Sequence, residues 1–382
     1  MINQDRLSRL FKNLVQIDSI SRKERTIAKT LTEIFKSLGA EVLTDSAGSK
    51  VGSDTGNLIA RFRGIKTDVA PLLLNAHMDT VQPGEGIKVI FSGGTFKSDG
   101  TTILGADDKS ALAIIIETIK TLHEHNLPHG PLEVVVTICE EVGLLGAKNL
   151  NYSLIRSRYG YSLDSSDTDE IVTRTPAANH IQFKVHGRDA HAGAAPEKGI
   201  NAIQLASGAI SELRLGRLDE ETTANIGLIE GGKATNIVPS LVTVAGEVRS
   251  HSPEKLDRET KQIIRSFEHQ ISNYKTAHPS DDGLPRLETE VWEDFPLLKI
   301  PDDHPVVTLA KKAAGRLGQS MKTETKGGGS DANVFFKHGI VTGVLGTGMK
   351  DVHTVRESIR LDDMMRSAKL LLEIIQLHAE GD

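Results

Sequence analysis

The amino-acid sequence predicts an α/β protein into which a second, α+β domain is inserted. Three observations predict this fold class. Short apolar segments alternate with amphipathic helical segments in the first part of the chain, this alternation stops near residue 178, and it resumes near residue 296. Apolar strands that alternate with helices are typical of a sheet covered by helices on both faces. A chain of 382 residues is also long enough for two domains.

Two helices are expected at the beginning of the chain. Leucine, phenylalanine and valine recur at helical spacing between residues 7 and 15. Residues 21–24 have the sequence of a capping box, Ser-Arg-Lys-Glu, which predicts the start of a second helix that ends before Gly39.

Apolar segments then predict the strands of a sheet. These segments are residues 57–62, 71–75, 132–138 and 170–173. Residues 109–125 carry alanine, leucine and isoleucine along one side and predict a helix between the second and third strands. This part of the chain therefore has the order of elements of an α/β sheet.

A different order begins near residue 178. Strands are predicted at residues 180–185, 223–229, 241–248 and 286–292, and helices at residues 199–213 and 253–274. The order strand, helix, strand, strand, helix, strand is that of the ferredoxin-like split βαβ pattern. The chain then returns to the first type, with a helix at 306–317, a strand at 339–345 and a closing helix at 361–377. We therefore expect one domain from residues 1–177 and 296–382, with residues 178–295 inserted as a second domain.

The composition excludes several classes of protein. A formal net charge of −6 argues against nucleic acids and anionic membranes as main partners. No apolar run approaches the ~20 residues of a membrane span, and the first residues lack the pattern of a secretory signal. The single cysteine, Cys139, lies in an apolar run and is expected to be a buried, inert thiol in a reducing cytoplasm.

The most informative feature of the sequence is an ordered set of acids and histidines at the boundaries of predicted elements. The set comprises His77, Asp79, Asp107, Asp108, Glu140, Glu141, Asp164 and His353. Each pair alone would be unremarkable, for example as a helix cap or a solvated charge pair. Together they follow apolar strands or begin a helix, and ligands collect at the carboxyl ends of strands in α/β sheets. The set predicts a site for metal-assisted hydrolysis.

The residue types predict two metal ions with a shared ligand. Asp107 can bridge two divalent ions ~3.5–4 Å apart because a carboxylate has two oxygens. His77 with Asp164 would complete one site, and Glu141 with His353 the other. Imidazole and carboxylate ligands suit zinc, and cobalt or manganese also fit such geometry.

Two acids of the set are expected to act without binding metal. Glu140 can take a proton from the attacking water and later deliver it to the leaving amine. Asp79 can accept the second N–H of His77 and so fix the tautomer of that ring.

Several motifs resemble the co-catalytic zinc peptidases, a superfamily that includes peptidase T, the aminoacylases, succinyl-diaminopimelate desuccinylase and the glutamate carboxypeptidases. The motifs are HMDT at 77–80, GADDKS at 105–110, TICEEVG at 137–143, AHAG at 190–193, ATNIVP at 234–239, GGSD at 328–331, and GTG at 346–348 followed by His353 and Thr354. The resemblance extends over essentially the whole chain and is strongest to peptidase T, the tripeptide aminopeptidase.

This resemblance implies a dinuclear zinc exopeptidase that removes the N-terminal residue of short peptides. It implies a mixed central sheet in the catalytic domain, a cis peptide between Asp107 and Asp108, and an inserted domain that acts as a lid and forms a homodimer. His191 would stabilise the oxyanion, Asn236 and Arg249 would contact the substrate, and residues 327–331, Gly329 and Ser330 among them, would lie near the end group of the substrate.

Other activities are compatible with the same residues. The same site could hydrolyse N-acyl amino acids or C-terminal glutamate conjugates, and a non-catalytic scaffold could keep the same fold. Loss of Glu140 or of a metal ligand would mark such a scaffold, and all of these residues are present. Ser165 and Ser166 follow Asp164 where many relatives have glycine, and the chain is shorter than a typical peptidase T.

Overall fold

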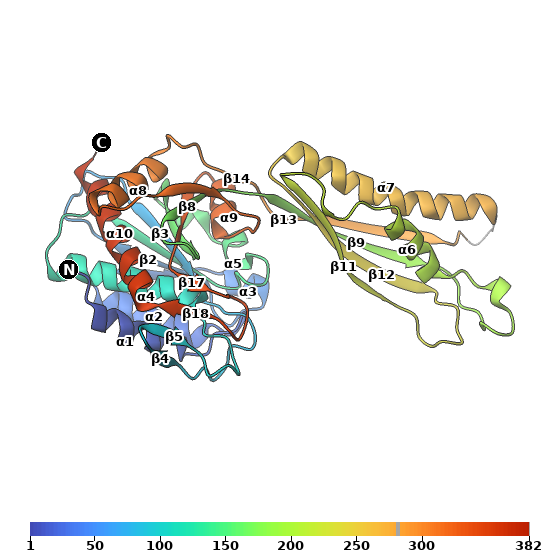
Figure 1. The fold of residues 1–382 in the computed structure, drawn as a ribbon, viewed down its shortest axis with the longest axis horizontal. Coiled ribbons are helices and arrows are strands. Elements are labelled where there is room, and N and C mark those ends of the chain that lie inside the picture. The colour runs from blue at the N-terminus through green and yellow to red at the C-terminus, as the bar shows by residue number, and fades with distance from the viewer. Residues whose placement is uncertain (280–282, 382) are drawn as a thin grey trace. The chain divides into compact units, whose positions relative to one another are not determined.

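The computed structural model describes residues 1–279 and 283–381. The chain divides into two compact units, one formed by Met1–Thr175 with Leu298–Asp382 and the other by Pro176–Leu297. Each division lies two residues from the corresponding boundary that the sequence predicts. Figure 1 shows the elements of both units, which are described separately below.

In the described part of the first unit, nine strands form a mixed sheet. They are β1 (Glu41–Thr44), β2 (Leu58–Phe62), β3 (Leu72–His77), β6 (Leu132–Thr137), β7 (Tyr159–Ser165), β8 (Glu170–Thr175), β14 (Leu298–Lys299), β15 (Lys322–Thr325) and β16 (Val341–Gly346). Their order is β1-β2-β6-β3-β7-β16-β8-β14, and β15 also pairs with β8. The neighbours β6, β3, β7 and β16 run parallel, whereas β2 and β8 pair antiparallel with the ends of this group.

Helices pack on this sheet and bury its central strands. The helices are α1 (Gln4–Val15), α2 (Arg25–Ser37), α3 (Ala47–Val51), α4 (Ala106–Glu124), α5 (Leu145–Lys148), α8 (Pro305–Arg316), α9 (Asp331–Lys337) and α10 (Leu361–Glu380). Helix α4 contacts β3 and β7, α8 contacts β7, β16 and β8, and α10 packs on both α4 and α8. All residues of β3 and β6 are buried, which explains why these strands read as continuous apolar runs without alternation. The predicted α/β fold with a mixed, helix-flanked sheet is confirmed.

The predicted capping box at residues 21–24 is wrong. Helix α2 begins at Arg25, whose backbone N–H donates to the Asp54 carboxylate at 2.8 Å. Because Asp54 supplies the acceptor, Ser21 and Glu24 bond elsewhere. The Ser21 hydroxyl donates to Asp79 Oδ2 at 2.7 Å, and Glu24 accepts from the backbone of Cys139 at 3.0 Å.

Four short strands of the first unit form a second, smaller sheet that the sequence did not predict. They are β4 (Ile90–Ser92), β5 (Thr95–Lys97), β17 (Met349–Lys350) and β18 (Ser358–Arg360), in the order β17-β18-β5-β4. Strands β17 and β18 form a hairpin whose connecting loop carries His353. Segments this short show no usable periodicity.

The second unit has the predicted ferredoxin-like order of elements, and this prediction is confirmed. Its elements are β9 (Ala177–His186), α6 (Ala202–Ser211), β10 (Gly216–Arg217), β11 (Thr222–Gly231), β12 (Leu241–Ser250), α7 (Pro253–Ala277) and β13 (Arg286–Phe295). The antiparallel sheet has the order β10-β11-β12-β9-β13, and α6 and α7 pack on it. The unit has its own core, in which Phe183 of β9 stacks on Phe267 of α7. Among residues 1–279 and 283–381 we find no helix with the length and apolar character to cross a membrane.

Candidate active site

The acids and histidines of the predicted site meet at one edge of the large sheet. His77 is the last residue of β3, Asp164 lies near the end of β7, and Glu140 and Glu141 follow β6. These three strands and β16, which leads to the hairpin of His353, are the four neighbouring parallel strands. Their carboxyl ends lie at the same edge, so residues far apart in the sequence become neighbours.

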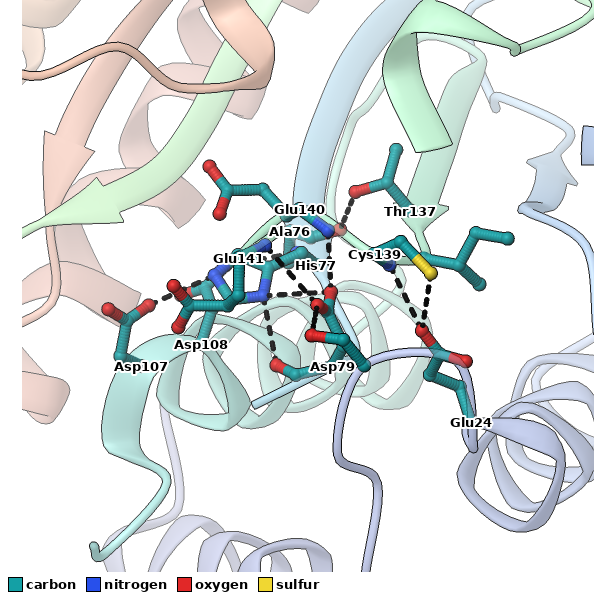
Figure 2. Close-up of polar contacts among 12 residues, drawn as sticks. Glu24, Ala76, His77, Asp79, Asp107, Asp108, Thr137, Cys139, Glu140 and Glu141 are labelled. Atoms are coloured by element: carbon teal, nitrogen blue, oxygen red, sulfur yellow. Dashed lines mark hydrogen bonds and ion pairs between the residues drawn. The ribbon is translucent and has the colours of Figure 1, made fainter. Parts of the chain in front are cut away.

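Asp107 lies at the centre of this group and faces a different histidine with each oxygen. Its Oδ1 is 3.0 Å from Nε2 of His77, and its Oδ2 is 3.2 Å from Nε2 of His353. The same His353 nitrogen is 2.9 Å from Oε2 of Glu141. Figure 2 shows Asp107, His77 and Glu141 turned toward one another. A carboxylate with one potential ligand on each side has the arrangement that bridging of two cations requires.

Two groups of side chains in the described residues could each hold a metal ion. One group is His77, Asp107 and Glu141, and the other is Asp107, Asp108 and Asp164, with the ligand atoms of each group within 4.8 Å of one another. Asp107 belongs to both groups. The grouping differs from the predicted one, because Asp164 groups with Asp108 where the sequence paired it with His77. Asp108 is thus a potential ligand that sequence reasoning did not assign, although its position beside Asp107 in the sequence was the available signal.

Unpaired buried oxygens support a cation at this position. In the described residues, Oδ1 of Asp108 and Oε1 of Glu141 are buried without a hydrogen-bond partner. Oδ2 of Asp108 accepts the backbone N–H of His77 at 3.2 Å. The peptide between Asp107 and Asp108 is cis, as the resemblance implies. Buried polar atoms nearly always have partners, so these oxygens fit ligands of a metal ion.

The electrostatics of the cluster also favour a bound cation. Burial, reinforced by neighbouring acids, raises the pKa of Asp108, Glu140 and Asp164 well above their ordinary values. Burial would also raise the pKa of Asp107, but hydrogen bonds from His353 and His77 outweigh it and hold that pKa below the usual range. Hydrogen bonds to Asp107 and Glu141 raise the pKa of His353 to about 10. Acids this close together require positive charge among them, which protonated histidines or divalent cations can supply.

The carboxylate of Asp79, which the sequence predicted to orient His77, bonds to the backbone of Glu140 and Glu141. Its Oδ1 accepts the N–H of Glu140 at 2.9 Å, and its Oδ2 accepts the N–H of Glu141 at 3.2 Å (Figure 2). The Asp79 carboxylate is 3.5 Å from Nδ1 of His77, whereas the backbone oxygen of Asp79 is 3.0 Å from it. The main chain of Asp79 therefore offers the nearer acceptor for His77, and its carboxylate fixes the backbone of Glu140 and Glu141.

A pocket of about 200 Å³ opens beside the cluster. It is lined by Asp107, Glu140, Glu141, Asp164, Ser165, Val172, Thr175, Lys326, Gly328, Gly329, Ser330, Val344 and His353. Gly329 and Ser330, predicted to contact substrate, thus line the same pocket as four of the five predicted ligands, Asp107, Glu141, Asp164 and His353. Glu140 lines this pocket and, like His353, belongs to neither of the two potential metal groups.

Three further buried carboxylates bond to the segments that carry the site residues, and of these only Asp331 lies in a segment that the sequence analysis placed near the substrate. Glu24 accepts from the N–H and thiol of Cys139 at 3.0 and 3.2 Å, and Cys139 has a positive φ of 51° just before Glu140. Asp331 accepts from the Thr137 hydroxyl at the end of β6, and burial raises its pKa to about 6. Glu357 accepts three backbone N–H groups around Asp107. Only Asp331 had a signal in the sequence, its place in the GGSD motif.

Two of the predicted residues of the second unit, His191 and Asn236, lie in segments that contact each other. Nδ1 of His191 accepts the N–H groups of Gly193 at 3.2 Å and Ala194 at 3.1 Å. The loop that contains Asn236 lies beside His191, since the backbone oxygen of Asn236 accepts the N–H of Ala192 at 2.9 Å. Because Nδ1 acts as an acceptor, the neutral ring carries its proton on Nε2.

Arg249 lies on β12, an interior strand of the second sheet. Its guanidinium donates to both oxygens of Glu247 at 2.9 and 3.0 Å and lies 5.4 Å from the ring centre of Phe295. The forked contact orients this guanidinium.

The sequence matches the family described as Peptidase family M20/M25/M40 over residues 73–377. The chain belongs to this family. The uncharacterized protein YqjE of Bacillus subtilis (strain 168) is 43% identical over 378 residues, which cover 98% of this chain and 99% of that protein. The aminopeptidase PepT of Bacillus cereus ATCC 10987 has a structure similar to this chain, with a TM-score of 0.89, 42% identity and 99% coverage of both chains.

A tripeptidase of Staphylococcus aureus subsp. aureus mu50 is also similar, with a TM-score of 0.92, 39% identity and full coverage of both chains. The predicted resemblance to peptidase T-like members of this family is confirmed, and with it the prediction that the chain is a peptide-bond hydrolase.

Proposed function

We propose that this chain is a dinuclear zinc-dependent aminopeptidase that removes the N-terminal residue of short peptides, tripeptides above all. The observation that carries the proposal is the position of Asp107, whose two oxygens face His77 and His353 at 3.0 and 3.2 Å. The similarity to proteins named aminopeptidase PepT and tripeptidase supports the same substrate class.

The proposed metal ligands are the residues of the cluster at the sheet edge. His77, Asp107, Glu141, Asp164 and His353 would hold two ions, with Asp107 shared between them. The mixture of imidazole and carboxylate ligands favours zinc, and cobalt or manganese would fit as substitutes. When bound, two such ions polarise a substrate carbonyl and make a water molecule more acidic.

Glu140 is the proposed general base and acid. Its backbone N–H is bonded to Asp79, which fixes the start of its side chain, and the residue lines the pocket. From there it can accept a proton from the attacking water and donate it to the nitrogen of the leaving amine. In this proposal Glu140 is not among the five ligands, so its oxygens remain available for this transfer.

The second unit supplies the proposed contacts to the rest of the substrate. The bonds of His191 Nδ1 leave Nε2–H as a donor for the carbonyl oxygen that becomes negatively charged in the reaction. Arg249, already oriented by Glu247, is proposed to bind a substrate carboxylate, with Asn236 as a further polar contact. Gly329 and Ser330 are proposed to contact the end group of the peptide from the first unit.

Substrate choice is tested with tri-alanine, with the same peptide acetylated at its N-terminus, and with N-acetyl-alanine. The first residue of tri-alanine carries an isotope label, and the products are detected by mass spectrometry. We expect labelled alanine and unlabelled dialanine from the peptide with a free N-terminus. The acetylated peptide should give little product, because its N-terminal amine is blocked. Turnover of N-acetyl-alanine but not of tri-alanine would contradict the proposal and identify an N-acyl-amino-acid amidohydrolase instead.

We also propose a cytoplasmic homodimer formed through the second unit. Leu228 and Ile229 of β11 are 64% and 51% exposed. In the described residues, β10 pairs with the outer edge of β11 only at Thr223 and Ala224, so the rest of this edge has no strand partner. An open strand edge with exposed apolar side chains favours pairing with a second copy of the chain.

Light scattering tests this dimer with two variants. Leu228→Glu would place an unpaired charge in the interface and should give a monomer. Ile65→Glu, at a residue of the first unit that is 52% exposed, should leave the dimer intact. A wild-type protein that is monomeric at every concentration, or a dimeric Leu228→Glu variant, would show that the interface lies elsewhere or does not exist.

A further inference from the structure

Glu357 joins two segments of the candidate site that are far apart in the sequence. Its Oε2 accepts the backbone N–H groups of Leu104 at 2.7 Å and Gly105 at 2.8 Å, and its Oε1 accepts the N–H of Asp107 at 3.0 Å. Only 1% of Glu357 is exposed. The residue lies four positions after His353, so one buried side chain connects the loop of His353 to the backbone of Asp107.

The loop that carries His353 depends on an anchor of this kind. His353 is half-exposed and has a positive φ of 61°, a backbone conformation that non-glycine residues seldom adopt. Within the loop, the Thr354 hydroxyl donates to the oxygen of Asp351 at 2.8 Å, and the N–H of Glu357 donates to the oxygen of Thr354 at 3.1 Å. These bonds shape the turn, but the carboxylate of Glu357 is what attaches its end to the segment of Asp107.

The donors around Glu357 require a carboxylate rather than an amide. Three N–H groups point at its two oxygens, which together offer enough lone pairs and a full negative charge. If a glutamine oxygen kept the bonds to Leu104 and Gly105, its NH₂ group would face the N–H of Asp107. The substitution would therefore disturb the proposed bridging ligand in particular.

We propose that Glu357 is a positioning residue that sets the separation of Asp107 and His353 and thereby the affinity for the metal ion that these two residues share. The inference rests on the proposed dinuclear function. Substitution of residues that hydrogen-bond to the direct ligands of a metal ion changes the affinity of the protein for that ion ~10–100-fold. Glu357 has the burial, the charge and the contacts of such a residue.

The test compares Glu357→Gln with Glu133→Gln. Glu133 is also buried, at 2% exposure, and its Oε2 accepts the N–H groups of Arg156 and Ser157 at 2.8 and 2.7 Å. It lies at the beginning of β6, whereas Glu140 and Glu141 follow the end of that strand. Both substitutions replace a buried carboxylate that binds several backbone groups, so both should lower the melting temperature of the metal-free protein.

Only Glu357→Gln should change the metal site. Titration of the metal-free proteins with zinc should show one of two ions binding ~10–100-fold more weakly in Glu357→Gln, and unchanged binding in Glu133→Gln. The visible spectrum of the cobalt-substituted protein should change in the first variant alone. If Glu357→Gln does not fold, Glu357→Asp can be used instead. Aspartate keeps the negative charge on a side chain shorter by one methylene, and it should weaken the binding of the same ion.

Three outcomes would overturn the inference. Equal zinc affinity and an unchanged cobalt spectrum in a folded Glu357 variant would show that the residue has only a structural role. An equal loss in Glu133→Gln would show a general effect of destabilisation. Fewer than two zinc ions bound by the wild-type protein would overturn the proposed function, and this inference with it.

Discussion

Replacement of Glu140 by glutamine should lower kcat about 10²- to 10⁴-fold while both metal ions remain bound. Glutamine has nearly the same shape, and its backbone N–H can still bond to Asp79 as that of Glu140 does at 2.9 Å. What the variant loses is a group that can accept a proton from water and return it to the leaving amine. Since Glu140 lines the pocket but is not one of the five proposed ligands, the metal count should not change.

The neighbouring residue provides the matched control. Glu141 has one oxygen 2.9 Å from Nε2 of His353 and another without a partner, as expected of a ligand. Glu141→Gln should therefore lose metal affinity as well as activity, and elemental analysis of the purified variants separates the two effects. A Glu140→Gln protein that is active, or one that has lost its metal, would show that Glu140 is not the base.

Much of the fold and of the site follows from local sequence patterns. The strands β3 and β6 read as apolar runs because all of their residues are buried, and acids or a histidine lie at or just beyond their ends. Because neighbouring parallel strands end at one edge, His77, Asp164 and Glu141 could be placed together from the sequence alone. The family resemblance added the cis peptide at Asp107 and Asp108, which local patterns do not indicate.

The residues that sequence reasoning missed have partners far away in the chain. Glu357 accepts from Leu104, 253 residues earlier, and Glu24 accepts from Cys139, 115 residues later. No local pattern distinguishes such a glutamate from a surface residue. The failed capping box at residues 21–24 has the same cause, since Ser21 bonds to Asp79, 58 residues away, rather than to the helix that follows it.

Replacement of Asp107 by asparagine should remove the shared ligand of both proposed ions. An amide offers one oxygen where the carboxylate offers two, and it carries no charge to hold two cations together. The His77 and His353 nitrogens, 3.0 and 3.2 Å from the two oxygens of Asp107, would then face a group that cannot serve both sides. Loss of several kcal/mol of transition-state stabilisation corresponds to ~10³-fold or more in rate.

Asp45→Asn is the control for this variant. The Asp45 carboxylate also accepts several bonds, from the N–H groups of Ala47, Asn57 and Asn151 at 3.0, 2.9 and 3.1 Å, but it is no part of the acid cluster. We expect this variant to lose some thermal stability and to keep its activity and metal content.

A pair of metal ions joined through Asp107 is the central feature of the proposed site, and zinc titration of the metal-free protein tests it directly. Wild-type protein and Asp107→Asn should be titrated side by side, with bound zinc and tri-alanine hydrolysis followed together. We expect two zinc ions per wild-type chain, with activity that requires them, and weak binding with almost no activity in the variant. Full hydrolysis by the metal-free wild-type protein, or two tightly bound ions in Asp107→Asn, would contradict the proposed site.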